Sequence, residues 1–256
     1  MTRAALEFRA LPDVPEVAPG ADLAALTVTA LERAGLSLQP GDVLVFAQKI
    51  VSKAEGRFRR LAETVPNAQA RELAARCGKD ARLVELVLQE SSEVVRVAPN
   101  VLITRHRRGY VMANAGIDRS NTGAADDGGT VLLLPENPDA SARRLRTALN
   151  ARCGVAPGVI VSDSFGRPWR LGTVNVALGV AGIPALIDLR GARDRDDRAL
   201  QVTQVAVADA IAAGAGLAMG EATEGTPIVH VRGVQAAAPC NDGQSLIRAT
   251  DEDLFR

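Results

Sequence analysis

The chain has 256 residues, and its 30 Lys and Arg are balanced by 30 Asp and Glu, so it carries no net charge at neutral pH. That balance argues against a protein that binds duplex nucleic acid, and an aromatic content of 3% leaves few platforms for stacking single-stranded bases. Hydrophobic residues make up 47% of the chain, which is ordinary for a globular enzyme and argues against disorder. The three cysteines match no zinc spacing, and the first residues lack a signal-peptide core. We therefore expect a reduced, cytoplasmic protein with no membrane or nucleic-acid partner.

Hydrophobic periodicity and breaker residues predict alternating strands and helices in the first half of the chain. Asp22 is expected to cap a helix, and Lys53 to lie in a polar loop that follows a buried strand. In chain order the predicted elements are a strand at 6–11, a helix at 22–34, a strand at 42–51, helices near 67–76 and 80–89, and strands at 94–97, 101–105 and 110–113. The polar loop at 115–129 is too long for a simple connector, so we expect it to be functional or disordered.

The second half continues the alternation. Its predicted elements are a strand at 130–134, a helix capped by Asp139, a strand at 159–161, strands at 174–180 and 185–189, a helix at 200–219 and a strand at 227–231. The long helix is apolar almost all round, which predicts burial on several sides rather than a membrane span. Gly214, Gly216 and Gly220 lack dinucleotide-binding spacing and indicate close helix packing instead. The mixture predicts an α+β (mixed α/β) fold, with 1–256 as a single unit or as two subdomains.

The segment 158–172, GVIVSDSFGRPWRLG, is the most informative of the chain. Its β-branched run predicts a buried strand that stops at Ser162, and polar residues follow at once. Asp163 offers a carboxylate for a hard cation, and Arg167 and Arg170 match anionic groups. A strand that simply runs into a polar surface turn is the equal alternative for this segment alone.

Four polar positions follow predicted strands or helices: Lys53, Asp118 with Asn121, Asp163 with Ser164, and Glu221. Their carboxylate and hydroxyl oxygens suit one or two divalent ions, and a lysine beside them suits bridging phosphates. Taken singly, each position is more typical of solvated surface. Convergence of these positions is therefore a hypothesis that the spacing alone does not establish.

Six segments occur in an order that closely resembles the coenzyme F420-0:L-glutamate ligase family, the γ-glutamyl ligases of deazaflavin coenzyme biosynthesis. They are LPDVPEV, GDVLVFAQKIVSKAEGR, VMANAGIDRSN, GVIVSDSFGRPWRLG, VNVALGVAGI and MGEATEGTPIVHVRG, and they extend over nearly the whole chain. The resemblance implies a family-specific ligase fold and an intertwined homodimer. It also implies that no nitroreductase-type domain is fused after residue 256.

The family resemblance implies a GTP-dependent ligase. GTP would phosphorylate the terminal carboxylate of the coenzyme F420 precursor, and the amine of L-glutamate would attack the acyl phosphate, with release of GDP and phosphate. The implied cofactors are two Mg²⁺ or Mn²⁺ ions and K⁺. This chemistry requires no covalent nucleophile on the enzyme, which agrees with the absence of a recognisable catalytic triad.

The same resemblance assigns roles to residues at matching positions. The catalytic residues would be Lys53, Asp118 and Asp163, and the metal ligands Asp118, Asp163, Ser164 and Glu221. The nucleotide would contact Leu11, Pro12, Asp13, Val14, Gln48, Lys49, Lys53, Asn121, Met219, Gly220, Glu221, Ala222, Thr223, Glu224, Gly225 and Thr226. Two alternatives stay open, namely a metal-dependent nucleotide hydrolase and a non-catalytic nucleotide-binding module.

Overall fold

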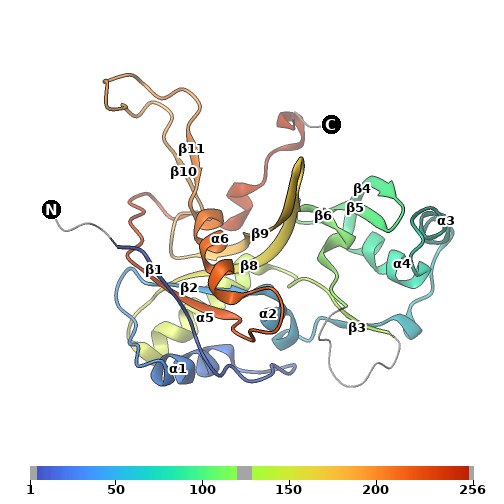
Figure 1. Ribbon diagram of the computed structural model, residues 1–256, viewed down its shortest axis with the longest axis horizontal. Helices are drawn as coiled ribbons and strands as arrows, with labels where there is room; N and C mark the ends of the chain where they lie inside the picture. Colours follow the sequence, from blue (N-terminus) through green and yellow to red (C-terminus); the bar gives the residue numbers. More distant parts are fainter. Residues whose placement is uncertain (1–4, 120–128, 254–256) are drawn as a thin grey trace.

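The computed structural model describes residues 5–119 and 129–253, and a five-stranded sheet forms its centre (Figure 1). The strands follow the order β1 (Glu7–Ala10), β12 (Ile228–Arg232), β2 (Val43–Ala47), β8 (Gly158–Arg167) and β9 (Arg170–Ala181). Only β2 and β8 run parallel, and every other neighbouring pair in this sheet is antiparallel. The predicted α+β fold is confirmed by this mixture of helices and sheets.

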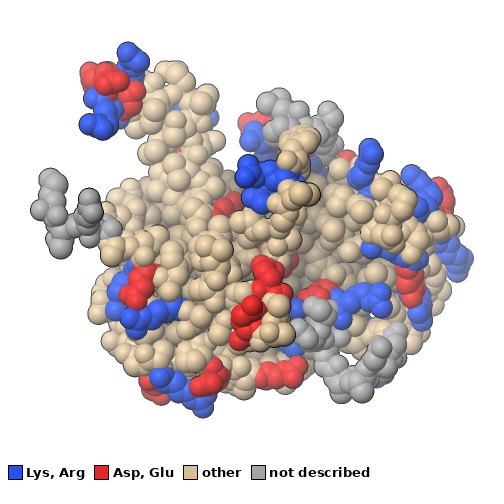
Figure 2. All heavy atoms as spheres, viewed as in Figure 1, with Lys and Arg blue, Asp and Glu red and all other residues tan. Residues whose placement is uncertain are grey.

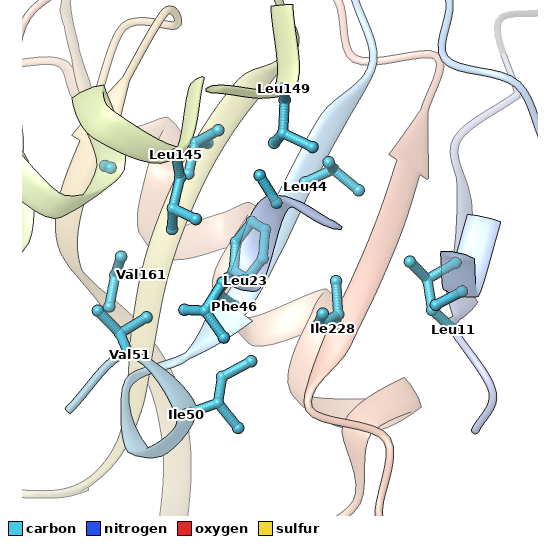
Figure 3. Close-up of a cluster of buried hydrophobic side chains, with 14 of the residues drawn as sticks. Leu11, Leu23, Leu44, Phe46, Ile50, Val51, Leu145, Leu149, Val161 and Ile228 are labelled. Atoms are coloured by element: carbon cyan, nitrogen blue, oxygen red, sulfur yellow. The ribbon is translucent and has the colours of Figure 1, made fainter. Parts of the chain in front are cut away.

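Helices cover both faces of this sheet because its inner strands are apolar on both sides. Leu44 and Phe46 of β2 point into a cluster with α1 (Leu23–Arg33), α2 (Gln48–Ala54) and α5 (Pro138–Cys153), shown in Figure 3. Val43 and Val45 point to the other face, where α6 (Val207–Met219) packs. The alternation along β2 therefore fixes which helices lie on each face.

A second body of elements packs around its own apolar cluster, to one side of the central sheet (Figure 1). It contains α3 (Ala68–Cys77), α4 (Ala81–Gln89), and a sheet of β4 (Ser91–Ala98), β5 (Val101–His106) and β6 (Val111–Ala113). Two smaller pairs complete the described strands: β3 (Phe58–Arg60) with β7 (Thr130–Leu132), and β10 (Leu186–Asp188) with β11 (Gln204–Ala206). Short 3-10 turns lie at Leu61–Glu63, Asn114–Gly116, Gly243–Leu246 and Thr250–Glu252.

The outer edge of β9 is bonded to side chains instead of to another strand. Asp139 Oδ1 accepts from the N–H of Val180 at 2.8 Å, and Asp209 Oδ1 accepts from the N–H of Ala177 at 2.8 Å. The hydroxyl of Tyr110 donates to the carbonyl of Leu178 at 2.7 Å. Backbone groups that an edge strand would otherwise present are thus satisfied from α5, α6 and the turn before β6.

An ion cluster closes the amino end of β2. Asp42 accepts hydrogen bonds from both Nε and Nη2 of Arg232, at 2.9 and 2.7 Å, and from the backbone N–H of Gln39 at 2.8 Å. Its carboxylate also lies 2.8 Å from Nε2 of His230. Burial opposes ionisation of Asp42, but the hydrogen bonds from Arg232 and His230 outweigh it and lower the pKa of this carboxyl.

The structure corrects several predicted boundaries. The strand predicted at 42–51 ends at Ala47, and Gln48 begins α2, so Lys53 lies on a helix and not in a loop. The cap of α5 is Asn137, whose side chain accepts from the N–H of Ala140, while Asp139 lies within the helix and bonds to β9. The strand predicted to stop at Ser162 continues to Arg167 because β9 pairs with it along its whole length.

The long apolar helix is shorter than predicted, since α6 begins at Val207. Its buried residues lie towards the sheet, whereas Leu217 is 91% exposed, so burial on several sides does not hold within the described chain. The prediction of close packing at its glycines is confirmed. A Cβ at Gly214 would lie 2.5 Å from the ring of Phe8, and one at Gly216 would lie 2.8 Å from Cγ of Asn175.

Candidate functional site

A cavity of about 990 Å³ lies at the carboxyl ends of the parallel strands β2 and β8. This is the edge at which sheets containing parallel strands commonly bind ligands, because the loops that leave the strands diverge there. Its walls come from the segment after β1, from α2, from the turn before Asp118, from the β8–β9 hairpin and from the loop between α6 and β12.

Helix α2 supplies the cations of the cavity. It begins directly where β2 ends, so Gln48, Lys49 and Lys53 all line the cavity. The side chain of Lys53 is only 8% exposed, and its Nζ lies 3.1 Å from Oε1 of Glu16, whose side chain is 73% exposed. A buried ammonium paired with one exposed carboxylate retains donors for an anionic ligand.

Asp118 lies on the opposite wall and is held by backbone pairing. Its N–H donates to the carbonyl of Leu132 at 2.9 Å, and its carbonyl accepts from the N–H of Leu132 at 2.8 Å. Asn114 and Ala115 just before it both have φ near +52°, a conformation that non-glycine residues rarely adopt. The carboxylate of Asp118 lies 2.7 Å from Nζ of Lys49. A constrained turn thus delivers a carboxylate to the cations of α2.

Asp163 and Ser164 reach the cavity from the middle of β8, not from a loop. Burial is the main cause that raises the pKa of Asp163 to about 7, and the negative charges of Asp118 and Glu221 act in the same direction, whereas the N–H of Ser164 and the ammonium of Lys49 oppose the shift. Asp163 therefore lies within electrostatic range of two further carboxylates. Such a concentration of negative charge is relieved by a bound cation.

The loop after α6 forms another wall of the cavity. Gly220 ends the helix with φ +73°, and a Cβ there would lie 2.2 Å from the carboxyl carbon of Glu224. The carboxylate of Glu224 folds back to accept from the N–H of Ala222 at 2.8 Å. Thr226 donates to the carbonyl of Met219 at 2.9 Å, which closes the loop before β12. This compact loop presents Glu221 at the rim of the cavity.

The structure brings most of the predicted site residues to this one cavity. Those that line it are Val14, Gln48, Lys49, Lys53, Asp118, Asp163, Ser164, Met219, Gly220, Glu221, Ala222, Glu224, Gly225 and Thr226. Leu11, Pro12, Asp13 and Thr223 do not line it, and Leu11 is fully buried in the core. Asn121 lies outside the described residues. The contacts assigned to each residue stay predictions.

Three polar lining residues had no assigned role in the sequence-based prediction. Glu16 pairs with Lys53, Ser162 is buried beside Asp163, and Asn175 faces Ser164 across the hairpin. Only Asn175 carried a signal, as a polar residue within an apolar strand sequence. Its amide packs where Gly216 leaves room on α6, so the helix accommodates a polar group at the cavity wall.

Oxygen atoms dominate the groups that could hold a metal. Among residues 5–119 and 129–253, no three His, Cys, Asp or Glu side chains are already gathered as a metal site. Asp118, Asp163, Ser164 and Glu221 nevertheless line the same cavity, and carboxylate and hydroxyl oxygens fit hard ions such as Mg²⁺ and Mn²⁺. The donor set therefore fits the predicted metal type.

The fold and the cavity define the class first, an α+β protein whose cavity brings two lysines beside several carboxylates. No helix of the described chain is long and apolar enough to cross a membrane. Comparison with known proteins then identifies the kind of enzyme. The family model for F420-0:Gamma-glutamyl ligase matches residues 13–233, most of the chain. The chain belongs to this family, and it is a ligase.

Curated relatives named "Coenzyme F420:L-glutamate ligase" align over nearly their full length. The protein from Methanopyrus kandleri is 45% identical over 98% of both chains. That from Methanothermobacter thermautotrophicus is 44% identical over 95% of this chain and 96% of its own. That from Halobacterium salinarum is 46% identical over 96% of this chain and 94% of its own.

Proposed function

We propose that this enzyme joins L-glutamate through an amide bond to the coenzyme F420 precursor, with GTP as the energy source. The proposal rests on the match, over nearly the full length, to relatives named "Coenzyme F420:L-glutamate ligase". It also rests on one cavity that contains Lys53 and the carboxylates of Asp118, Asp163 and Glu221. A cavity of about 990 Å³ is at the upper end of the range for small-molecule sites, which suits several substrates at once.

The proposed reaction has two steps. An oxygen of the precursor's carboxylate attacks the γ-phosphorus of GTP, the bond to the bridging oxygen breaks, and GDP leaves. The amine of L-glutamate then attacks the acyl carbon, phosphate leaves with the electron pair of the C–O bond, and the amine loses a proton. Phosphorylation is required because a carboxylate oxygen is a poor leaving group, whereas phosphate is a good one.

The residues of the cavity would position and neutralise these anions. Lys53 would donate to the phosphates of GTP after exchanging its contact with Glu16, whose side chain is 73% exposed and would be left to water. Asp118, Asp163, Ser164 and Glu221 would hold two Mg²⁺ or Mn²⁺ ions, which supply charge neutralisation when bound. The loop from Met219 to Thr226 would enclose the nucleotide.

One experiment separates this proposal from its alternatives. The protein is incubated with GTP, Mn²⁺, K⁺, L-glutamate and the precursor, and the masses of the products are measured by mass spectrometry. The ligase gives a precursor heavier by one glutamyl unit, with one GDP for each amide. A metal-dependent hydrolase gives GDP with or without glutamate and no heavier product, and a nucleotide-binding module gives neither.

We further propose that the enzyme works as a cytoplasmic homodimer in which loops of one subunit complete the other's site. Support comes from the family resemblance and from Leu217 of α6, whose apolar side chain is 91% exposed and would be covered by a second copy. Specific activity should then fall on dilution below the dimer dissociation constant. A monomer in light scattering with full specific activity would contradict this assembly.

A further inference from the structure

The tip of the β8–β9 hairpin carries large apolar side chains on its surface. Arg167 pairs with Arg170 across the tip, and Pro168 and Trp169 form the turn between them. Trp169 is 80% exposed and Leu171 is 98% exposed. Trp169 is also the single tryptophan in the sequence, so the largest apolar side chain of this protein lies in solvent.

The backbone and the neighbouring arginine make the tip unlike an ordinary surface turn. Trp169 has φ +57°, a left-handed conformation that is unfavourable for an aromatic residue and is concentrated at functional turns. Arg167 is half-buried, and its Nε has no hydrogen-bond partner within the described chain. Among the described residues, its Nη2 donates one long hydrogen bond, 3.3 Å to the carbonyl of Leu171. The Nε is itself buried, so the terminal nitrogens of this weakly held guanidinium are the donors that an external acceptor would meet.

The tip is continuous with the candidate active site. Asp163, Ser164, Phe165 and Gly166 line the cavity from the same strand that ends at Arg167. Four residues of extended strand place the tip about 13 Å beyond Asp163. In Figure 2 basic atoms lie beside the hairpin tip, above the acidic atoms of the loop that follows α6. An elongated ligand with its carboxylate in the cavity would reach this tip with its other end.

We propose that the hairpin tip is the docking subsite for the aromatic ring of the coenzyme F420 precursor. The inference rests on the proposed function, in which a linker connects the reacting carboxylate of this precursor to its deazaflavin ring. The indole of Trp169 stacks on the planar ring, and the guanidinium groups of Arg167 and Arg170 donate to its carbonyl or anionic oxygens. A second copy of the chain fits this tip less well than the precursor does. Its packing would remove both guanidinium groups from water without supplying an identified counter-ion.

Equilibrium binding of the isolated precursor, followed by its own absorbance and fluorescence without nucleotide, tests the subsite. Trp169→Ala should weaken binding about tenfold or more, the usual loss when an aromatic platform for a heterocycle is removed, and Trp169→Phe should restore most of it. Arg167→Gln should weaken binding by about fivefold or more. Val202→Ala is the matched control, because Val202 is 84% exposed outside the hairpin, and it should leave binding unchanged.

Two readouts make the outcomes decisive. GTP affinity and the molar mass in light scattering should be the same for Trp169→Ala and the wild type. Unchanged precursor binding in Trp169→Ala would overturn the subsite, and a halved molar mass would assign the tip to a second copy. If wild-type protein binds the precursor through Trp169 but forms no glutamyl product, the proposed function fails and the subsite stands. If product forms and Trp169→Ala leaves the KM for the precursor unchanged, only the subsite fails.

Discussion

The two ends of strand β2 both carry buried charges, but they are built in opposite ways. At the amino end, Asp42 accepts from Arg232, His230 and a backbone N–H, and the cluster is closed. At the carboxyl end, Lys53 and Asp163 face a cavity of about 990 Å³. The pKa of Asp42 is lowered by its partners, whereas burial and neighbouring acids raise the pKa of Asp163 to about 7.

The contrast separates charges that hold the fold from charges that await a ligand. A carboxylate surrounded by fixed donors is stabilised in its ionised form without external help. A carboxylate that is desolvated beside other carboxylates is unfavourable until a cation arrives, and such groups are concentrated at functional sites. Substitutions at the two ends should therefore affect different measurements.

The largest expected effect is at the cavity. Asp163→Asn should lower kcat for glutamyl transfer by about 10²- to 10³-fold or more, because it removes a charge that the transferring phosphate group requires. The melting temperature should stay the same or rise, since the substitution removes a desolvated charge. Asp209→Ala is the control, a half-buried acid that bonds the backbone of β9 and does not line the cavity. It should lose stability and keep kcat. Unfolding of Asp163→Asn would instead give that residue a structural role.

The opposite pattern is expected at the amino end of β2. Asp42→Asn should lower the free energy of unfolding by about 3 kcal/mol, the usual effect of removing one partner from a buried ion cluster. Glutamyl transfer per folded molecule should not change, because the cluster lies away from the cavity. Urea denaturation and an activity assay on the same sample check both halves. Equal unfolding free energies would show that the cluster contributes nothing to stability.

A third substitution tests whether Lys53 binds the phosphates of GTP in the cavity. Lys53→Ala should weaken GTP binding by about 1.5–3 kcal/mol, the usual contribution of a charge-assisted hydrogen bond. Titration calorimetry with a non-hydrolysable GTP analogue measures it directly. Lys79→Ala is the control, because Lys79 lines a separate pocket next to α4. An unchanged dissociation constant for Lys53→Ala would exclude the phosphate role.

The smallest effect concerns pH. The folded state lowers the pKa of Asp42 below its ordinary value of 3.8, so its ionised form contributes stability above that pH. This contribution is lost as pH falls through the folded-state pKa. The difference in unfolding free energy between the wild type and Asp42→Asn should thus be constant near neutrality and shrink below about pH 4. A difference independent of pH would mean that the carboxylate's charge is irrelevant.

The sequence predicted local elements well where caps and breakers mark them. Asp22 and Gly35 enclose α1, and Asn67 and Gly78 enclose α3. The prediction failed at the boundary between β2 and α2. The segment 42–51 is mostly apolar, and such a run has no hydrophobic period that distinguishes a buried strand from a buried helix. The prediction also stopped β8 too early, since the continuation through Asp163 depends on pairing with β9, which no local pattern encodes.

The site was predicted as a set of residue types rather than as a geometry. Lys53, Asp118 and Asp163 were named from the sequence, and all three line one cavity. The contact of Lys53 with Glu16 joins positions 37 residues apart, so no motif could predict it. Trp169 and Arg167 lay within a recognised segment, but their exposure and missing partner are properties of the folded hairpin alone.

The side-chain cover of β9 also determines how copies of this enzyme can meet. With Asp139, Asp209 and Tyr110 bonded to its outer backbone between Ala177 and Val180, this part of the strand is closed to a foreign strand. Fibril-like growth through it is therefore disfavoured in the native state. In crowded or concentrated solutions, copies should therefore associate into discrete assemblies through side-chain contacts. The enzyme then stays dispersed while its cavity is free of substrate.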